Sequence, residues 1–234
     1  RQFRSKMISE KGVACAFDAI AQLHNPSVIL RDFQASESVD VAALFQRWDK
    51  LKAAVLSLAE CAPEDGRRQT WESFVTLKGE DADTHATLLR IMMLLRDQDS
   101  RKRISRLRRI YIEMMDQPDA SNVASELMRL AVETGGRNRK KRMAATQPIV
   151  VRYGGSRTQF GVFVQANEIV CSEGLLHAVV VSLAAHYVFH LQFDAEVTDV
   201  WLVLLHFLGL STREMKSNVG KRVAQAITAK VSQL

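Results

Sequence analysis

Two runs of basic residues are the part of this sequence best suited to chemistry. Residues 101–109 hold six cations in nine positions, and residues 137–142 hold five in six. Arginine dominates the first run, and its planar guanidinium can hold a phosphate through two parallel hydrogen bonds. The candidate phosphate-binding residues are therefore Arg101, Lys102, Arg103, Arg106, Arg108, Arg109, Arg137, Arg139, Lys140, Lys141 and Arg142.

The placement of charge along the chain strengthens this interpretation. Residues 96–142 contain thirteen Lys/Arg against seven Asp/Glu, an excess of +6, which equals the net charge of the whole protein. A positive field confined to one stretch attracts a polyanion. Few aromatic side chains lie near the basic runs, and Tyr111 and Tyr153 are the nearest. Binding of RNA or DNA is therefore expected to be directed mainly at the phosphate backbone.

The same basic residues also fit two roles that need no nucleic acid. The first run has acidic neighbours, among them Asp97, Asp99 and Glu113, and can be a solvated helix face with local partners. The second run follows Gly135–Gly136, and a short exposed Lys/Arg run of this kind also fits a nuclear-import signal. The sequence leaves these alternatives open.

Catalytic and metal-binding patterns are weak in comparison. His186 and His190 have the i, i+4 spacing of a helical metal pair, but no glutamate follows His186 and the surrounding helix is apolar. The loop Gly154–Arg157 is glycine-rich but lacks the spacing of a phosphate-binding loop and leads into a strand. Cys171 lies at a strand end, in no recognisable nucleophile motif. We therefore expect a protein that is not an enzyme, with no catalytic residues, no metal and no cofactor.

The secondary structure expected from the sequence changes along the chain, from helices before the second basic run to strands after it. The first 135 residues predict successive helices, of which 39–58 has the clearest 3.6-residue stripe. The first basic run falls on an expected helix over Arg101–Met115, and a further helix is expected over 121–132. The residues expected on the inner face of the 101–115 helix are Ile104, Leu107, Ile110, Tyr111 and Met114.

Beyond the second basic run the pattern predicts strands. Three short β-rich stretches lie at about 148–153, 159–164 and 168–171, with Ala166–Asn167 as the turn of the last hairpin. Apolar helices follow at 175–191 and 196–208. The fold class expected is α+β and predominantly helical, with an antiparallel β-meander at about 148–171 packed by C-terminal helices. The expected domains are a helical region 1–135, a basic linker 136–147 and a module 148–234.

The apolar C-terminal helices support a second function hypothesis. Residues 175–208 are more hydrophobic than surface helices need to be, which fits a protein–protein interaction or self-assembly module that buries a partner or a second copy. Burial within the chain itself would account for the same excess. Nucleic-acid binding and homo-oligomerisation are also compatible with each other.

Hydropathy and cysteine content limit the cellular compartments that are expected for this protein. No apolar run reaches the roughly 18 residues of a membrane span, so no membrane partner is expected. Three widely spaced cysteines favour a reducing, intracellular compartment, and the basic run at 137–142 extends that expectation to the nucleus. The chain begins without methionine or an apolar signal core, which is typical of a piece of a longer protein.

Two stretches resemble a region of uncharacterised, multi-copy animal proteins found especially in fish. They are FQRWDKLKAAVLSLA at 45–59 and FGVFVQANEIVCSEGLLHAVVVSLAAHYVFHLQFDAEVTDVWLVLLHFLGL at 160–210. In those proteins a Lys/Arg-rich linker precedes a strand–turn–strand, and a helix with a Tyr-x-Phe step follows, here Tyr187–Phe189. The resemblance covers roughly 45–208. It implies no established activity and carries over no functional residue.

Overall fold

A computed structural model gives the structure of the chain over most of its length. It describes residues 12–60, 77–95, 105–134, 147–154, 158–171, 173–209 and 217–234. These residues are mostly helical and include a four-stranded mixed sheet with helices packed on it. The α+β, predominantly helical class expected from the sequence is confirmed.

The chain forms two compact units, each assembled from separate segments. One, which we name the sheet unit, takes its residues from 1–36 and 109–194, and the other, the helical unit, takes them from 37–108 and 195–234. The regions expected from the sequence at 1–135, 136–147 and 148–234 are contiguous, whereas each unit joins parts distant along the chain. Most of the expected basic linker, residues 136–146 of 136–147, lies outside the described residues.

The sheet combines one parallel and two antiparallel pairings. Strand β1 pairs in parallel with β2, with Tyr111 opposite Val150, and β2, β3 and β4 form an antiparallel meander. The helix α7 (Ala120–Thr134) joins β1 to β2, so these three elements make a β–α–β unit. The strands, in spatial order, are β1 (Tyr111–Met114), β2 (Ile149–Tyr153), β3 (Gln159–Val164) and β4 (Asn167–Cys171).

The meander expected from the sequence is confirmed, but the helix expected over Arg101–Met115 is wrong in its second half. A helical turn covers 105–107, and the chain then enters β1. Ile110, Tyr111 and Ile112 are β-branched or aromatic residues that fit a pleated surface as well as a helix face. The parallel partner β2, almost forty residues further on, decides between the two conformations.

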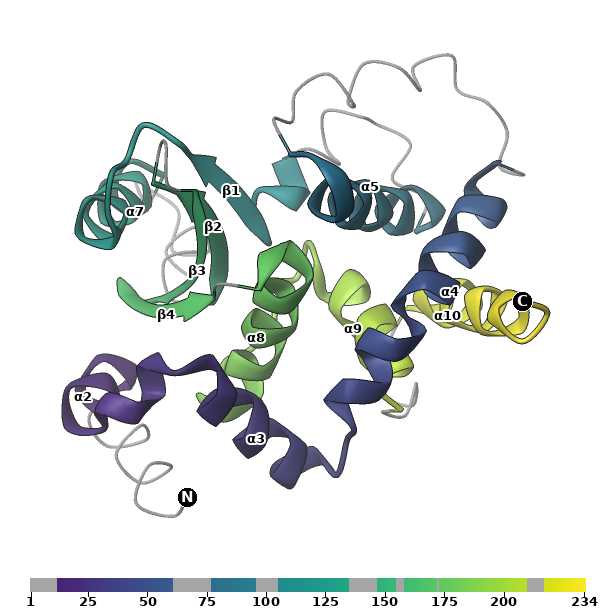
Figure 1. Ribbon diagram of the computed structural model, residues 1–234, viewed down its shortest axis with the longest axis horizontal. Helices are drawn as coiled ribbons and strands as arrows, with labels where there is room; N and C mark the ends of the chain where they lie inside the picture. Colours follow the sequence, from purple (N-terminus) through teal and green to yellow (C-terminus); the bar gives the residue numbers. More distant parts are fainter. Residues whose placement is uncertain are drawn as a thin grey trace. The chain divides into compact units, whose positions relative to one another are not determined.

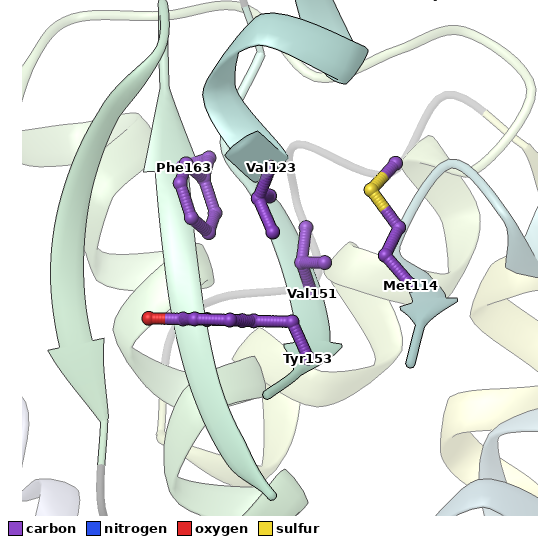
Figure 2. Packing of buried hydrophobic residues seen from close by; sticks show 5 residues of the cluster. All are labelled: Met114, Val123, Val151, Tyr153 and Phe163. Carbon is purple, nitrogen blue, oxygen red and sulfur yellow. The ribbon is translucent and has the colours of Figure 1, made fainter. Parts of the chain in front are cut away.

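Helices cover both faces of the sheet (Figure 1). On one face, side chains of α7 pack on alternate residues of the strands (Figure 2). On the other face, α8 (Gly174–Val188) contacts β2, β3 and β4. Double coverage explains why five consecutive residues of β3 are buried. The buried cluster on the α7 face consists of Met114, Val123, Val151, Tyr153 and Phe163.

The turn between β3 and β4 lies one residue earlier than expected. Its two residues are Gln165 (φ 49°) and Ala166 (φ 68°), and Asn167 is already the first residue of β4. Positive φ at both central positions is the conformation of a type I′ turn, whose twist matches that of a two-residue hairpin.

A glycine in the middle of the sheet makes room for a polar pair. Tyr153 on β2 extends its ring across β3, and its hydroxyl donates a hydrogen bond to Glu168 Oε1 on β4 (Figure 2). A Cβ at Gly161 would lie 2.5 Å from Glu168 Oε1 and 3.0 Å from Phe163 Cε2. Glycine at position 161 therefore leaves the space that the Tyr153–Glu168 hydrogen bond needs.

We expect Gly161→Ala to lower the free energy of unfolding by about 1–3 kcal/mol, because the added methyl forces its neighbours off their positions. Chemical denaturation measures the change. In a Glu168→Ala background the cost should shrink, since the closest obstructing atom is gone. An equal cost in both backgrounds would show that Glu168 is not the obstruction.

The N-terminal elements of the sheet unit pack against β4 and the end of α8. His24 Nδ1 lies 2.6 Å from the carbonyl oxygen of Glu168 on the outer side of β4. The rings of Phe17 and Phe189 stack with centroids 5.0 Å apart. The elements are α2 (Val13–Ala19), a 3₁₀ helix η1 (Ala21–His24) and α3 (Pro26–Glu37).

The helical unit is built on the longest amphipathic helix. Leu44, Trp48, Leu51 and Val55 of α4 are all buried, which confirms the stripe expected there. Helix α4 contacts α5 and α10, and α9 contacts α5 and α10. The four helices are α4 (Val41–Glu60), α5 (Gly79–Leu94), α9 (Thr198–Phe207) and α10 (Asn218–Val231).

Candidate nucleic-acid interface

Three of the eleven candidate phosphate-binding residues lie in the described part of the chain. Arg108 is exposed, and Arg106 and Arg109 are partly exposed, on the short stretch that leads into β1. The other eight lie outside the described residues. They are Arg101, Lys102, Arg103, Arg137, Arg139, Lys140, Lys141 and Arg142.

The parallel pairing of β1 and β2 brings together the residues that directly precede the two strands. Because the strands run in the same direction, the residues that precede them lie at the same edge. The backbone N–H of Val150 donates to the carbonyl oxygen of Ile110 at 2.9 Å. Arg109 directly precedes Ile110, and Gln147 lies two residues before the first residue of β2. We call this end of the β1–β2 pair the amino edge.

A third segment, residues 192–194, lies at the amino edge as well. Gln147 Nε2 donates to the carbonyl oxygen of Gln192 at 2.7 Å. Arg109 Nη1 forms an ion pair with Asp194 Oδ2, with the two side chains 30% and 13% exposed. Residues before β1 and before β2 therefore both bind the segment that contains Phe193.

The Arg109–Asp194 ion pair changes the role expected for Arg109. A guanidinium bonded to a partly buried carboxylate has one side of its donor fork occupied. The pair also balances the negative charge of Asp194, which would otherwise repel a phosphate at this edge. Arg109 therefore acts first as a residue that holds segment 192–194 in place.

The two tyrosines nearest to the basic runs in sequence are both buried. Tyr111 donates to Glu113 Oε1 at 2.8 Å, and Arg152 Nη1 donates to the same oxygen at 3.2 Å. Burial, together with the Glu113 carboxylate, raises the pKa of Tyr111, so its hydroxyl stays protonated. The ring of Tyr153 lies in the core on the α7 face, also with a raised pKa caused first by burial. Neither ring offers a face to a nucleobase.

Phe193 is the aromatic residue that sequence reasoning missed. Its ring lies beside His186, with centroids 4.7 Å apart, and meets Tyr187 edge-on at 6.0 Å. It is half-buried rather than buried. It lies more than fifty residues from the second basic run, so only the pairings of Gln147 and Arg109 with its neighbours place it at the amino edge.

The histidine pair considered for its spacing is split between two environments. His186 is buried, its Nδ1 lies 2.8 Å from the carbonyl oxygen of Ser182, and burial lowers its pKa to about 4. His190 is exposed and lies beyond the end of α8, with φ 54°. Among the described residues there is no group of three or more His, Cys, Asp or Glu side chains arranged to hold a metal ion.

Cys171 is buried at the end of β4. Burial, aided by the Glu168 carboxylate, raises the pKa of its thiol to about 12. The nucleophilic thiolate form is therefore scarce at neutral pH. This environment is that of a core cysteine.

The apolar C-terminal helices keep their hydrophobic side chains inside the protein. In α8, thirteen of the fifteen residues are buried, and in α9 the aromatic side chains Trp201 and Phe207 are buried with the leucines between them. Burial within the chain accounts for the hydrophobic excess at 175–208. It gives no support to a partner-binding surface on these helices.

No described helix has the length and hydropathy needed to cross a membrane. Comparison with models of protein families, with curated proteins and with solved structures gives no match.

Proposed function

We propose that this protein is a non-enzymatic nucleic-acid-associated protein that binds the phosphate backbone through its two basic runs. The observation that supports the proposal is the parallel pairing of β1 and β2, because each of these neighbouring strands is the first strand that follows one of the basic runs along the chain. Neighbouring strands lie about 4.8 Å apart, so the chain that follows each run enters the sheet close to the other. We infer that one nucleic-acid strand contacts both runs near this edge. The residues that we propose to contact phosphates are Arg101, Lys102, Arg103, Arg106, Arg108, Arg109, Arg137, Arg139, Lys140, Lys141 and Arg142.

The distribution of charge along the chain also supports phosphate binding. Cations at neighbouring positions repel one another by tenths of a kcal/mol per pair, and an anionic partner relieves that repulsion. The excess of +6 is confined to residues 96–142, so the attraction is local to the two runs. The run at 137–142 would also serve as a nuclear-import signal, and we infer an intracellular, nuclear location on that basis.

Fluorescence anisotropy with labelled 12-nucleotide RNA, single-stranded DNA and duplex DNA tests the proposal. We expect submicromolar binding by the wild type at moderate salt. Two double variants, Arg106→Glu/Arg108→Glu and Arg139→Glu/Lys140→Glu, should each weaken binding by at least about tenfold, because each removes two phosphate contacts and adds two repulsive charges.

A matched control separates this effect from the change in net charge. Arg47 and Lys50 are exposed on α4, away from both basic runs in sequence, and Arg47→Glu/Lys50→Glu changes the net charge by the same amount. This control should weaken binding much less than either test variant. Absence of wild-type binding at low salt, or equal losses in all three variants, would overturn the proposal.

A further inference from the structure

Strand β4 is at one edge of the sheet, and part of its backbone faces away from β3. The carbonyl oxygen of Glu168 lies 2.6 Å from Nδ1 of His24, which is outside the sheet, so this carbonyl points outward. Peptide groups alternate along a strand, and the backbone N–H and C=O of Val170 therefore point the same way. The turn at 165–166 leads to the same result, because the residues that flank a two-residue turn bond to each other within the hairpin.

The residues of β4 themselves do little to prevent a further strand from pairing with this edge. Natural proteins protect edge strands with devices that include lysine, proline, bulges and covering elements. The segment Asn167–Cys171 contains no lysine or proline, and its register with β3 is continuous. Its acidic side chain, Glu168, is bonded to Tyr153. Val170 is β-branched and 47% exposed, opposite Gly161, which has no side chain to pack on it.

The 3₁₀ helix η1 covers this edge in their place. It contacts β4, and Figure 1 shows the N-terminal elements of the sheet unit beside that strand. His24, the last residue of η1, holds the outward carbonyl oxygen of Glu168. The ring of Phe17 stacks on Phe189 at 5.0 Å and lies 4.9 Å from the ring of His24. One polar contact and one aromatic contact therefore fix η1 at the edge.

We propose that η1 is a guard that keeps β4 from pairing with β4 of a second copy of this chain. The outward backbone of β4 is self-complementary in an antiparallel arrangement centred on Ile169. Glu168 of one copy then faces Val170 of the other, and each such pair exchanges both of its backbone hydrogen bonds. The same patch is used on both copies, which is the symmetry of most homodimers.

The guarded state and the paired state exclude each other. His24 holds the Glu168 carbonyl oxygen that a second copy of β4 needs as its acceptor. Release of η1 frees this acceptor, and pairing removes the exposed Val170 side chain from water, which is favourable. The inference is independent of nucleic-acid binding.

Light scattering coupled to size-exclusion chromatography tests the proposal on the full chain over a range of protein concentrations. His24→Ala removes the polar contact, and Phe17→Leu/His24→Ala removes the aromatic stacking as well. We expect the wild type to remain monomeric and the mass of both variants to double, at a lower concentration for the double variant. Gln22→Ala, an exposed position on the same 3₁₀ helix, is the matched control and should remain monomeric.

A substitution on β4 identifies the interface. Val170→Lys places a charge on the edge, where lysine opposes strand pairing. Added to His24→Ala, it should restore the monomer. Gln46→Lys adds the same charge at an exposed position of α4 in the helical unit and should leave the dimer unchanged. Circular dichroism and thermal unfolding check that each variant retains the fold.

Three results would overturn the proposal. If His24→Ala and the double variant are folded and remain monomeric, η1 is not a guard. If the dimer of His24→Ala persists after Val170→Lys is added, the copies associate through another surface. If the wild type is already a dimer that Val170→Lys dissociates, β4 is an interface that η1 does not block.

Discussion

Raising the salt concentration from about 50 mM to about 200 mM is expected to weaken the binding of a single strand by about 2.5 to 3.5 orders of magnitude. Cations that neutralise phosphates release condensed counterions, and for single strands the logarithm of affinity falls by about 0.7 per phosphate contact for each tenfold rise in salt. The range given corresponds to six to eight of the eleven candidate residues making contact. Anisotropy titrations at five salt concentrations measure the slope.

The salt dependence of the variants tests which residues make the ionic contacts. Arg106→Glu/Arg108→Glu and Arg139→Glu/Lys140→Glu should each make the slope shallower by about 1.4, which is two contacts. Arg47→Glu/Lys50→Glu should run nearly parallel to the wild type. A wild-type slope near zero would show that ionic contacts do not carry the binding.

Acidification from pH 6.5 to pH 4 is expected to cost the protein about 3 kcal/mol of stability through His186. The pKa of this buried histidine falls from its ordinary 6.5 to about 4, with burial as the first cause. Between these values the unfolded chain binds a proton that the folded protein excludes. The free energy of unfolding therefore rises with pH in this window and is lost as pH falls through it.

The protonation of other groups also changes the free energy of unfolding in this pH range. Burial lowers the pKa of His177, which adds a loss of the same sign. Burial raises the pKa of Glu168, so the folded protein takes up that proton more readily and gains stability as pH falls. The contribution of His186 must therefore be measured as a difference between proteins.

Urea denaturation of the wild type and of His186→Gln at pH values from 4 to 7 makes that comparison. The difference between their unfolding free energies should shrink or invert as pH falls from 6.5 to 4, since glutamine does not titrate. His190→Asn is the control, because His190 is exposed and asparagine tolerates its positive φ. A wild-type curve that stays parallel to that of His186→Gln would contradict the predicted shift.

The elements that the sequence locates correctly are those whose pattern is local. The stripe of Leu44, Trp48, Leu51 and Val55 predicts α4 because the spacing of a helix face is contained within the helix. The meander at 149–171 is predicted by β-rich stretches separated by short turns. Helix α8 is apolar on all sides, and the structure buries it on all sides.

The conformation of 110–115 does not follow from the sequence. Ile110, Tyr111 and Met114 fit the inner face of a helix, and the same stretch also fits a strand. The deciding interaction is the ladder with Val150 to Tyr153, a pairing between residues about forty positions apart. The hydrogen bonds and packing of this ladder override the helical preference of the local pattern.

The sequence by itself determined the fold class and singled out the two basic runs, because composition, charge and periodicity are properties of neighbouring residues. Only the tertiary structure decided that β1 runs beside β2, and with it that the chain before each strand leads to one edge. The same holds for segment 192–194, which reaches that edge through the bonds of Gln147 with Gln192 and of Arg109 with Asp194. These contacts join residues 45 and 85 positions apart, and no local pattern encodes such a distance.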